Sequence, residues 1–453
     1  MAIESDVVVI GGGLAGAFAA LSAAREGAHV RLLSYKQSTL AQASGLVDIL
    51  GYAPDGVETG AGATAADART DGGPLVDPYE AIPDLPETHP YSAVGVDGVR
   101  EAMGLFDEVA DRYRGGHTDR NALLPTHGGT VKPTARYPAG AAAGVASDDR
   151  EALLVGFETL VDFDAPHAAA HLRNAGVPFD VRGVTVSFPG DINADAKVTR
   201  YAKLLDEDAP VGGGGGRTRR ARDALAAAVE PHLDGAGRVG FPAVLGDDDP
   251  AAVRDGLSDA LGVPVFEVPM GPPSLPGLRL EDDLYAALDA AGVSMETGNP
   301  VVDFDAGNGG AGGGDGSGGA RRIAEVYVDR NGAQIPFSAD QFVLATGGLV
   351  GKGIGSDREG VEEPVFDCHI PHPADRYEWF DRDAFGDHPF ARFGVRTDDD
   401  LRPLDADGAV EFENLRAAGS VLGGYDFAAE KSGGGVSVAT GHAAGAGAAE
   451  VAR

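Results

Sequence analysis

The sequence predicts an α/β fold, and three observations support this. The chain opens with a strand, a glycine turn, a helix and a second strand within its first 34 residues. Strand and helix patterns alternate again from Glu151 onward, and a short strand and a glycine-led helix close the chain after Asn414. With 453 residues, of which 43% are hydrophobic, the chain is long enough to bury the cores of two or three domains.

The opening unit has the spacing G-x-G-x-x-G of a nucleotide-binding turn. Residues 7–10 are all β-branched and apolar and predict a buried strand, residues 14–25 predict a small-residue helix, and residues 29–34 predict a second strand. In such a unit the first glycine permits the tight turn, the second lets the backbone approach a phosphate, and the third lets the helix pack closely on the strand. The helix N-terminus offers N–H groups and a partial positive charge to an anion. The candidate nucleotide-binding residues are Gly11, Gly12, Gly13, Leu14, Ala15 and Gly16.

The second strand ends in Ser34, where dinucleotide sites of this type usually carry an acid that binds the adenosine ribose. A hydroxyl binds a ribose less firmly than a carboxylate does, so Ser34 makes a mononucleotide plausible in place of a dinucleotide. Ser44 and Gly45 follow in a small, polar stretch that could pass close to a flat ring. An ordinary loop is the alternative for this stretch.

The composition along the chain predicts its domains. Residues 1–52 and 276–453 are expected to form a Rossmann-like domain from both ends of the chain. Residues 89–275 are expected to form an inserted α/β domain that caps a substrate site. Residues 53–88, rich in Gly, Ala, Asp and Pro, predict a surface loop, and the glycine run at 306–320 predicts a disordered hairpin tip.

Basic and hydroxyl side chains gather between Thr126 and Tyr137, in a chain that is poor in positive charge. Lys132 and Arg136 alternate there with Thr130 and Thr134. Such side chains in a glycine-containing loop could hold a phosphorylated substrate. A solvated loop is the alternative.

The C-terminal part supplies further candidates for the nucleotide site. Residues 333–337 and 341–345 predict two strands, the second of which runs into a glycine pair. Residues 431–435 open an Ala/Gly-rich helix whose first turn is glycine and can point bare N–H groups at a ligand. A glycine-rich packing helix is the alternative. The candidates in this part are Thr346, Gly347, Gly419, Ser420, Gly434, Gly435 and Val436.

The charge balance makes nucleic acids and anionic membranes poor partners. Seventy acidic residues against 36 basic ones leave a net charge of −34, Asp exceeds Glu about twofold, and only six residues are lysine. This pattern is typical of molar salt, where the screening length falls to about 3 Å. We therefore expect a halophilic host and a loss of structure at low salt.

Cysteine usage and the N-terminus set two further bounds. Cys368 is the single cysteine, which excludes an internal disulfide and a four-thiolate iron–sulfur cluster held by this chain alone. It is expected to be a small packing residue. The N-terminus lacks the basic flank of a signal peptide, and no apolar run reaches the roughly 18 residues of a membrane span. The chain is therefore expected to be soluble and cytoplasmic, and no metal site is predicted.

Several motifs, taken in order, closely resemble the B-subunit family of anaerobic glycerol-3-phosphate dehydrogenases. The first and last motifs alone would fit the wider superfamily of FAD-dependent oxidoreductases that includes fumarate reductases. The motifs are Gly11–Gly16, Ser44–Gly45 with Asp48, His89–Ser92, Ala345–Gly348, Leu401–Pro403, Gly419–Gly424 and Gly433–Gly435.

The resemblance implies a flavin subunit of a glycerol-3-phosphate:quinone oxidoreductase, which converts sn-glycerol 3-phosphate to dihydroxyacetone phosphate. The flavin implied by the family is FMN, which Ser34 favours, and FAD is the alternative because the glycine turn suits a pyrophosphate. The catalytic candidates are His89, as the general base, and Arg402; Lys132 and Arg136 are the candidates for the substrate phosphate.

The resemblance also implies partners. They are a catalytic flavin subunit, called the A-subunit in this family, and an iron–sulfur C-subunit, through which electrons reach quinone at the inner face of the cell membrane. Two other interpretations stay open: a non-catalytic electron-relay or assembly subunit of the same complex, and a stand-alone flavin oxidoreductase similar to fumarate reductase.

Overall fold

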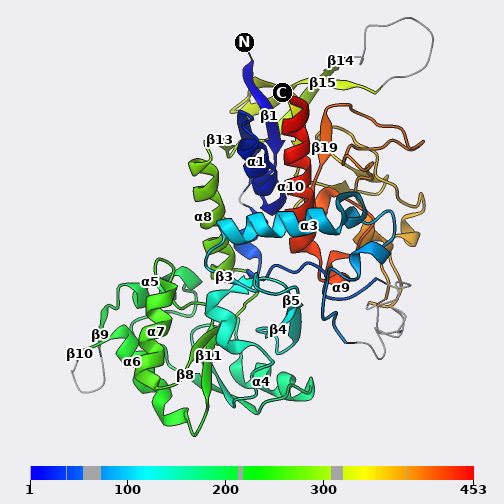
Figure 1. The fold of residues 1–453 in the computed structure, drawn as a ribbon. Helices are drawn as coiled ribbons and strands as arrows, with labels where there is room; N and C mark the ends of the chain where they lie inside the picture. Colours follow the sequence, from blue (N-terminus) through cyan, green and yellow to red (C-terminus); the bar gives the residue numbers. More distant parts are fainter. Residues whose placement is uncertain are drawn as a thin grey trace, which may run out of the picture. The chain divides into compact units, whose positions relative to one another are not determined.

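The computed structural model describes most of the chain, in two compact units. Unit 1 comprises Met1–Thr39, Asp48–Asp111 and Asp283–Arg453, and unit 2 comprises Leu40–Val47 and Arg112–Asp282 (Figure 1). The residues that the structure describes are 2–36, 38–54, 73–212, 218–307, 320–384 and 386–452. Residues 55–72 of the predicted surface loop and residues 308–319 of the predicted hairpin tip lie outside them.

Unit 1 is built on a seven-stranded mixed sheet with the order β13-β2-β1-β16-β15-β14, in which β19 also pairs with β16. Strands β13, β2, β1, β16 and β19 run parallel, and β15 and β14 continue the sheet antiparallel. The bounds are β1 Ile3–Ile10, β2 Val30–Ser34, β13 Ser294–Thr297, β14 Val301–Gly307, β15 Arg322–Arg330, β16 Ala333–Leu344 and β19 Leu415–Ala417.

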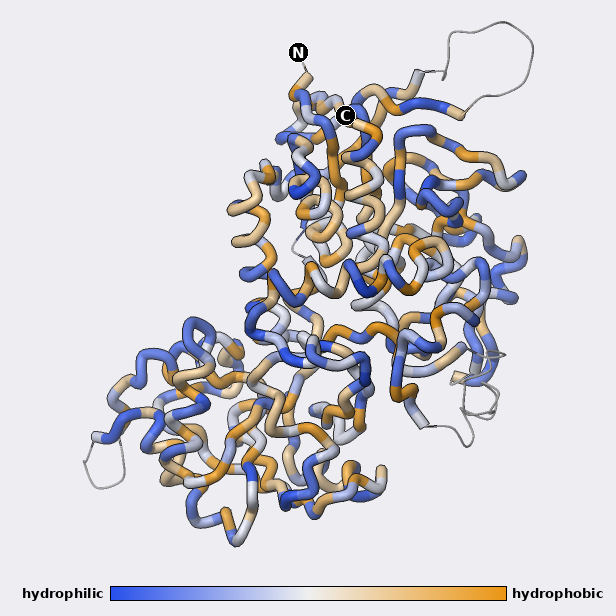
Figure 2. The backbone as a smooth tube through the Cα atoms, in the orientation of Figure 1, coloured by the Kyte–Doolittle hydropathy of each residue, from blue (hydrophilic) through white to orange (hydrophobic). Residues whose placement is uncertain are grey.

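Two small-residue helices cover one face of this sheet. Helices α1 (Leu14–Arg25) and α10 (Gly433–Ala452) pack on each other and on β1, and α3 (Pro90–Val109) packs on α10 (Figure 1). In Figure 2 both α1 and α10 are pale to tan over most of their length, because they consist mainly of alanine and glycine. Small side chains let two helix backbones approach each other closely, so these two helices form a tight layer.

The opposite face of the sheet is covered by the segment between β16 and β19. Val8 and Ile10 of β1 belong to a core that includes Phe342, Phe366 and Phe412. Cys368, 3% exposed, lies in the same core, and burial raises the pKa of its thiol well above the ordinary value. The prediction that Cys368 is a packing residue is therefore confirmed. Short elements in unit 1 are β17 Gly355–Ser356, β18 Val361–Glu362 and α9 Phe427–Glu430.

Unit 2 contains a four-stranded parallel sheet with the order β12-β11-β7-β8. Its helices α4 and α7 each begin at an aspartate whose side chain accepts a backbone N–H of the first turn, followed by a proline at the helix start. The bounds are β7 Ala152–Phe157, β8 Val181–Val186, β11 Arg238–Pro242, β12 Val265–Val268, α4 Ala165–Asn174, α5 Val198–Asp206, α6 Ala221–Val229 and α7 Pro250–Leu261. Three small antiparallel pairs complete the unit: β3 Tyr113–Arg114 with β6 Tyr137–Pro138, β4 Ala122–Pro125 with β5 Val131–Thr134, and β9 Pro210–Gly212 with β10 Thr218–Arg220. Helix α8 (Leu275–Ala290) belongs to unit 2 up to Asp282 and to unit 1 beyond it.

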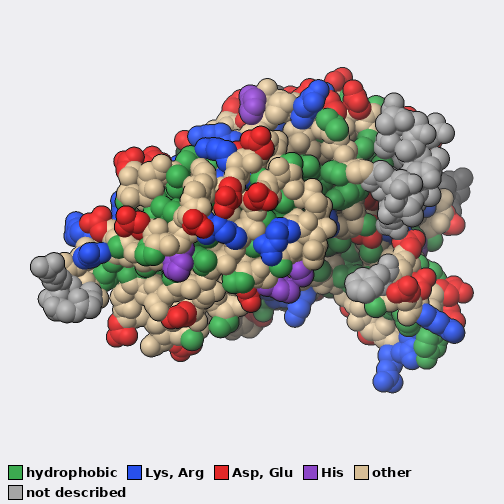
Figure 3. Space-filling model, turned by 90° about the horizontal axis from the view of Figure 1, so that it is seen from below, with side chains coloured by type: hydrophobic (Ala, Val, Ile, Leu, Met, Phe, Trp, Pro, Cys, Tyr) green, Lys and Arg blue, Asp and Glu red, His purple; other side chains and the backbone are tan. Residues whose placement is uncertain are grey.

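The surface carries the acidic excess of the sequence. Acidic side chains are spread over the face drawn in Figure 3. Among the residues described, no helix is both long enough and apolar enough to cross a membrane. The same residues include no cluster of three or more His, Cys, Asp or Glu side chains arranged to hold a metal ion.

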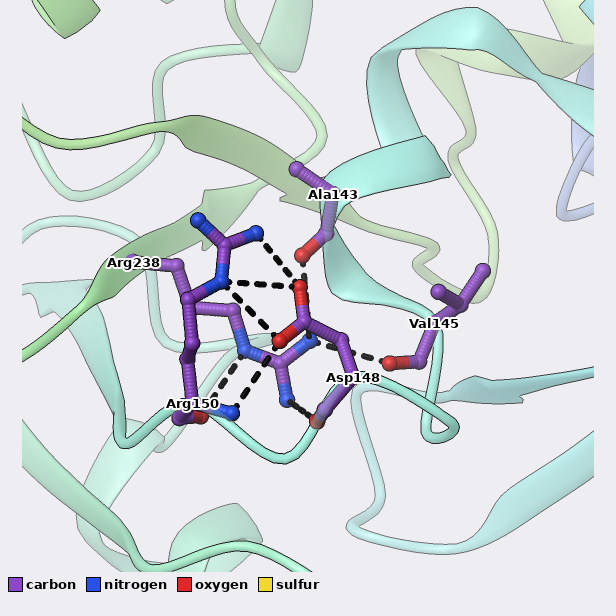
Figure 4. A network of polar contacts seen from close by, with 5 residues as sticks. All are labelled: Ala143, Val145, Asp148, Arg150 and Arg238. Atoms are coloured by element: carbon purple, nitrogen blue, oxygen red, sulfur yellow. Dashed lines mark hydrogen bonds and ion pairs between the residues drawn. The ribbon is translucent and has the colours of Figure 1, made fainter.

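A buried arginine holds the start of β11 in unit 2. The side chain of Arg238 is fully buried and donates to the carbonyl oxygens of Ala143, Val145, Asp148 and Arg150 at 2.7–3.2 Å (Figure 4). Its guanidinium also lies 3.8 Å from the Asp148 carboxylate. Since a buried guanidinium needs hydrogen-bond acceptors, and these carbonyl oxygens supply them, Arg238 serves as a structural residue.

The sequence-based α/β prediction is confirmed. Its opening strand, helix and strand correspond to β1, α1 and β2. The two strands predicted over 333–337 and 341–345 are wrong, because the structure has one continuous strand, β16. The polar residues that suggested a break, Ser338 and Asp340, alternate with more buried neighbours and fit within a strand whose other side is packed.

Candidate functional site

The carboxyl ends of four parallel strands meet at one edge of the unit 1 sheet. Ile10 of β1 lies in register with Leu33 of β2 and with Leu344 of β16, and Leu344 lies in register with Ala417 of β19. The residues that follow these strands are therefore neighbours, although they come from positions 11, 35, 345 and 418 of the chain. In open α/β sheets, ligands bind at the carboxyl ends of the strands.

The glycine turn after β1 is shaped by close backbone contacts. Gly11 has a φ of +121°, and a Cβ atom at this position would lie 2.1 Å from the Ala345 carbonyl oxygen. A Cβ atom at Gly16 would lie 1.8 Å from the Gly11 carbonyl oxygen. At Gly13, in contrast, no heavy atom lies within 4 Å of such a Cβ. The turn is thus packed at its first and third glycines and open at the second.

The open glycine begins α1. Gly13 is the N-cap residue and has no side chain to accept an N–H of the helix. The first-turn N–H groups, on Leu14, Ala15 and Gly16, have no acceptor within the helix itself. An anion placed here would receive these N–H groups, together with the positive end of the helix dipole.

Ser34, at the end of β2, is buried beneath the glycine turn. It is 4% exposed, and a Cβ atom at Gly12 would lie 2.5 Å from its Oγ atom. Its hydroxyl donates to the Lys36 carbonyl oxygen at 3.2 Å. Tyr285 of α8 also supports this turn, by donating its hydroxyl to the Gly12 carbonyl oxygen at 3.1 Å. The Ser34 side chain thus packs against Gly12 and supports the turn.

The loops after β16 and β19 are joined to each other. Ser420 Oγ accepts the N–H of Gly348 at 3.0 Å, and Gly347 has a φ of +90°. Thr346, next to them, has a buried Oγ1 atom with no hydrogen-bond partner among the described residues. The Thr346 hydroxyl is therefore available to donate or accept a hydrogen bond at this edge.

Gly419 links the loop after β19 to both helices. It has a φ of +77°, and a Cβ atom there would lie 2.5 Å from the Cβ atom of Ala15 on α1. Its N–H donates to Thr440 Oγ1 of α10 at 2.8 Å. Thr440 was not among the predicted residues, since its role depends on a contact that the sequence does not show.

The N-terminus of α10 also has bare donors. Gly435 donates its N–H to the Asp48 carbonyl oxygen at 2.6 Å. Gly433 and Gly434, which precede it, donate to no acceptor in the described part of the chain. A Cβ atom at Gly435 would lie 2.2 Å from the hydroxyl oxygen of Tyr91, so this glycine is required for packing. Val436 is fully buried behind it.

His89 lies in a buried polar cluster beside this helix terminus. It is 1% exposed and forms the N-cap of α3, where its Nδ1 atom accepts the Tyr91 N–H at 3.1 Å. Its Nε2 atom lies 3.2 Å from Glu430 Oε2. Because Nδ1 is an acceptor, Nε2 carries the proton and donates it to Glu430. Both ring nitrogens are therefore engaged within the protein.

Two tyrosines complete the cluster. Tyr91 donates its hydroxyl to the Ile49 carbonyl oxygen at 2.8 Å, and the Tyr425 ring lies 5.6 Å from the His89 ring. Burial raises the pKa of both phenols well above 10, so they stay neutral. The Tyr425 hydroxyl has no partner among the described residues. The sequence analysis did not predict a role for Glu430 or Tyr425. The position of Glu430, two residues before Ser432 and the three glycines that follow it, could have indicated a role at this helix terminus.

Arg402 forms ion pairs with two aspartates. Its guanidinium donates to Asp398 Oδ2 at 2.7 and 2.9 Å, and it lies 3.2 Å from Asp400. The hydrogen bond to Asp398 raises the pKa of Arg402. Within the described residues no contact joins Arg402 to His89 or to the glycine turn.

The remaining predicted residues lie in unit 2. Ser44 accepts the N–H of Leu46, and Gly45, with a φ of +78°, packs on Pro276. The predicted loop around Lys132 is the β4–β5 hairpin, with Lys132 on β5. Arg136 is only 5% exposed, and its Nη1 atom donates to the Ala135 carbonyl oxygen at 3.1 Å.

Comparison with known proteins identifies the family. The chain matches the family described as FAD binding domain over residues 6–436. A protein of Halobacterium salinarum, named as the probable B-subunit of anaerobic glycerol-3-phosphate dehydrogenase, is 66% identical over 450 residues, which are 99% of each chain. The chain belongs to the B-subunit family of anaerobic glycerol-3-phosphate dehydrogenases. A member of this family from Yersinia pseudotuberculosis is 30% identical over 450 residues, which are 96% of each chain.

Solved structures also align with the chain, at low identity. The open conformation of a flavocytochrome c3 fumarate reductase aligns with 99% of this chain and 79% of its own, with 11% identity and a TM-score of 0.44. Membership of the B-subunit family makes the chain a flavoprotein subunit of the oxidoreductase class. The expected halophilic character agrees with the Halobacterium relative.

The choice of FMN as the first flavin is not supported, because the matching family is one of FAD binding domains. The structure shows why Ser34 is a poor guide to the choice between FMN and FAD. Its hydroxyl is buried under Gly12 and bonded to the Lys36 carbonyl, so it says little about whether a ribose binds above the turn. An open Gly13 at an uncapped helix N-terminus and an unpartnered Thr346 hydroxyl fit a pyrophosphate-containing flavin.

Proposed function

We propose that this chain is the FAD-binding subunit of a complex that oxidises sn-glycerol 3-phosphate to dihydroxyacetone phosphate. The observation that carries the proposal is the 66% identity, over 99% of the chain, to a relative named for that dehydrogenase. The joined carboxyl edge of β1, β2, β16 and β19 supports the flavin part, since it gathers bare N–H groups and an unpartnered hydroxyl.

Each segment of the edge has a role in this proposal. The first turn of α1 binds the pyrophosphate through the N–H groups that follow Gly13. Thr346 Oγ1 would hydrogen-bond to the cofactor, and the N–H groups of Gly433 and Gly434 would donate to the flavin. When bound, FAD accepts a hydride equivalent from the alcohol carbon, and a positive helix terminus favours the charge that follows. Gly11, Gly12, Gly347, Gly419 and Ser420 hold these segments in place.

The residues proposed to act on the substrate include no free base. Removal of the alcohol proton requires a base, and His89 has both ring nitrogens engaged by Tyr91 and Glu430. We therefore assign His89 a positioning role in the resting protein. Lys132 and Arg136 stay the proposed ligands of the substrate phosphate, with Ser44 and Gly45 near the flavin ring. Arg402, held by Asp398, is proposed to act on substrate only if that ion pair opens.

The proposal includes partners. A single cysteine cannot hold a four-thiolate cluster, so electrons leave the flavin for quinone through a separate iron–sulfur subunit. The relatives are named as B-subunits, which supports the presence of other subunits. The proposal takes one of them to be a second flavin subunit and places the complex at the inner face of the cell membrane.

One observation favours a second candidate, an electron-relay subunit that does not itself oxidise substrate. The most buried candidate base, His89, donates and accepts only within the protein. In this alternative the flavin receives electrons from the second flavin subunit of the complex.

One experiment distinguishes the two candidate functions. The protein, purified in molar salt and loaded with FAD, is mixed without oxygen with sn-glycerol 3-phosphate, and the visible flavin absorbance is followed. The enantiomer sn-glycerol 1-phosphate is the control. Bleaching by the 3-phosphate alone supports the catalytic subunit, and bleaching only after the second flavin subunit is added supports the relay. A protein that cannot take up flavin would refute both.

A further inference from the structure

The residue before α10 is a serine that does not cap its helix. Ser432 occupies the N-cap position, because its carbonyl oxygen accepts the Val436 N–H at 2.9 Å. A serine here usually accepts an N–H of the first helical turn with its side chain. The Ser432 hydroxyl instead donates to Glu430 Oε2 at 2.9 Å. The first two helical N–H groups, on Gly433 and Gly434, stay without an acceptor in the described chain.

Glu430 collects three donors. Its Oε1 atom accepts the Asp426 N–H at 2.9 Å, and its Oε2 atom accepts the Ser432 hydroxyl and, at 3.2 Å, His89 Nε2. The side chain is 4% exposed. A carboxylate can be buried at this depth only when donors satisfy it, and here they do.

The same residue is fixed through its backbone. The Glu430 carbonyl oxygen accepts the N–H groups of Gly51 and Tyr52 at 2.8 and 2.9 Å. His89 is in turn held by the Tyr91 N–H. The Glu430 backbone is therefore held by Gly51 and Tyr52, and its carboxylate by His89 and Asp426, so that the carboxylate is fixed where the Ser432 hydroxyl donates to it.

A helix N-terminus without a side-chain cap is less stable than a capped one. A serine cap stabilises a helix, and the Glu430 arrangement leaves this cap unmade at a helix whose first turn contains three glycines. The hydrogen bond from Ser432 compensates for the burial of the Glu430 carboxylate, but it leaves the Gly433 and Gly434 N–H groups without an acceptor in the described chain. A ligand that accepts these N–H groups would give the uncapped terminus a function.

We propose that Glu430 is a positioning residue, which holds the Ser432 hydroxyl away from α10 so that the Gly433 and Gly434 N–H groups are available to the flavin. The inference rests on the proposed flavin-binding function. It assigns a role to a residue that touches neither the flavin nor the substrate.

The test is a double-mutant cycle in molar salt, with FAD affinity and the flavin reduction potential as readouts. In Glu430→Ala the Ser432 hydroxyl is free to cap α10 and compete with the flavin. We expect FAD affinity to fall about tenfold and the potential to become more negative. In the double variant Glu430→Ala/Ser432→Ala no capping side chain remains, and affinity and potential should return toward the wild-type values.

A merely structural Glu430 predicts the opposite pattern, in which the double variant binds FAD no better than the single one; that result would overturn the proposal. Glu363→Gln is the matched control. It is another buried carboxylate of unit 1, 1% exposed, that accepts backbone N–H groups of its own loop, and it should change only the melting temperature. If the wild-type protein takes up no flavin, that result refutes the proposed FAD-binding function and not the specific role of Glu430.

Hydrogen exchange tests the proposal without any variant, in case Glu430→Ala does not fold. In the flavin-free protein the amide hydrogens of Gly433 and Gly434 should exchange fast. Bound FAD should slow them by roughly tenfold or more, since a bound acceptor protects an amide hydrogen. Slow exchange without flavin would mean that the protein itself provides their acceptor, and would contradict the role of Glu430.

Discussion

Gly16 of α1 lies directly against the carbonyl group of Gly11: a Cβ atom on Gly16 would stand 1.8 Å from that oxygen. Replacing glycine by alanine inside a helix normally stabilises it by about 1 kcal/mol. At Gly16 the opposite is expected, because backbone atoms cannot yield. We predict that Gly16→Ala destabilises the protein by about 2 kcal/mol and removes flavin binding, as thermal unfolding and flavin titration will show.

Gly13→Ala is the control for this contact. Its Cβ would meet no atom within 4 Å, and its φ of −79° suits alanine. The melting temperature should therefore stay within about 2 °C, in keeping with a surface substitution. Flavin affinity should nevertheless fall, since the added methyl group fills the space assigned to the pyrophosphate. Unchanged flavin affinity would place the cofactor elsewhere.

The contact between α1 and α10 gives a second prediction. A Cβ atom on Gly441 would lie 2.3 Å from the Ala15 carbonyl oxygen, whereas one on Gly447 would lie 3.1 Å from Arg416 Nε, a side-chain atom that has to shift only slightly. Gly441→Ala should destabilise unit 1 by about 1–3 kcal/mol. Gly447→Ala should be neutral or slightly stabilising, and similar melting temperatures for both would argue against the tight helix layer.

Asp148 gives a pH-dependent prediction. The Arg150 guanidinium bonded to it lowers the pKa of Asp148 to about 2, against an ordinary value of 3.8. A lowered folded-state pKa contributes stability above the ordinary value, and this contribution is lost as the pH falls toward the folded-state pKa. The stability difference between wild type and Asp148→Asn should thus be constant above about pH 5 and shrink between about pH 4 and 2. A difference that is independent of pH would contradict the ion pair.

The net charge of −34 gives a salt prediction. In dilute buffer the screening length rises from about 3 Å at 1 M salt to about 30 Å at 0.01 M, so acidic side chains repel one another over much of the surface. Dialysis out of molar salt should abolish the circular dichroism of the folded chain. A spectrum that survives dialysis would show that the fold does not need salt.

The sequence was sufficient where short segments carry the information. The spacing of Gly11 to Gly16 and the apolar run before it predicted β1, α1 and the nucleotide edge, because a strand, a turn and a helix are local structures. The family followed from motifs in a fixed order. The start of α10 was visible for the same reason, as a run of three glycines.

Long-range contacts were not predictable from local patterns. Ser34 in place of the usual acid favoured FMN, but its hydroxyl donates to the Lys36 carbonyl oxygen, a contact that the sequence does not show. His89 looked like a free base, but its partner Glu430 is 341 residues away in the sequence. Arg238 gave no signal at all, because its four carbonyl partners belong to another segment of unit 2.

The central claim is that the edge after β1, β16 and β19 binds FAD. The most direct measurement is to purify the chain in molar salt, release any chromophore by denaturation, and identify and quantify it by chromatography against FAD and FMN standards. The account predicts a yellow protein that carries, or takes up, one FAD per chain. A colourless protein that takes up neither flavin, or one that retains only FMN, would contradict it.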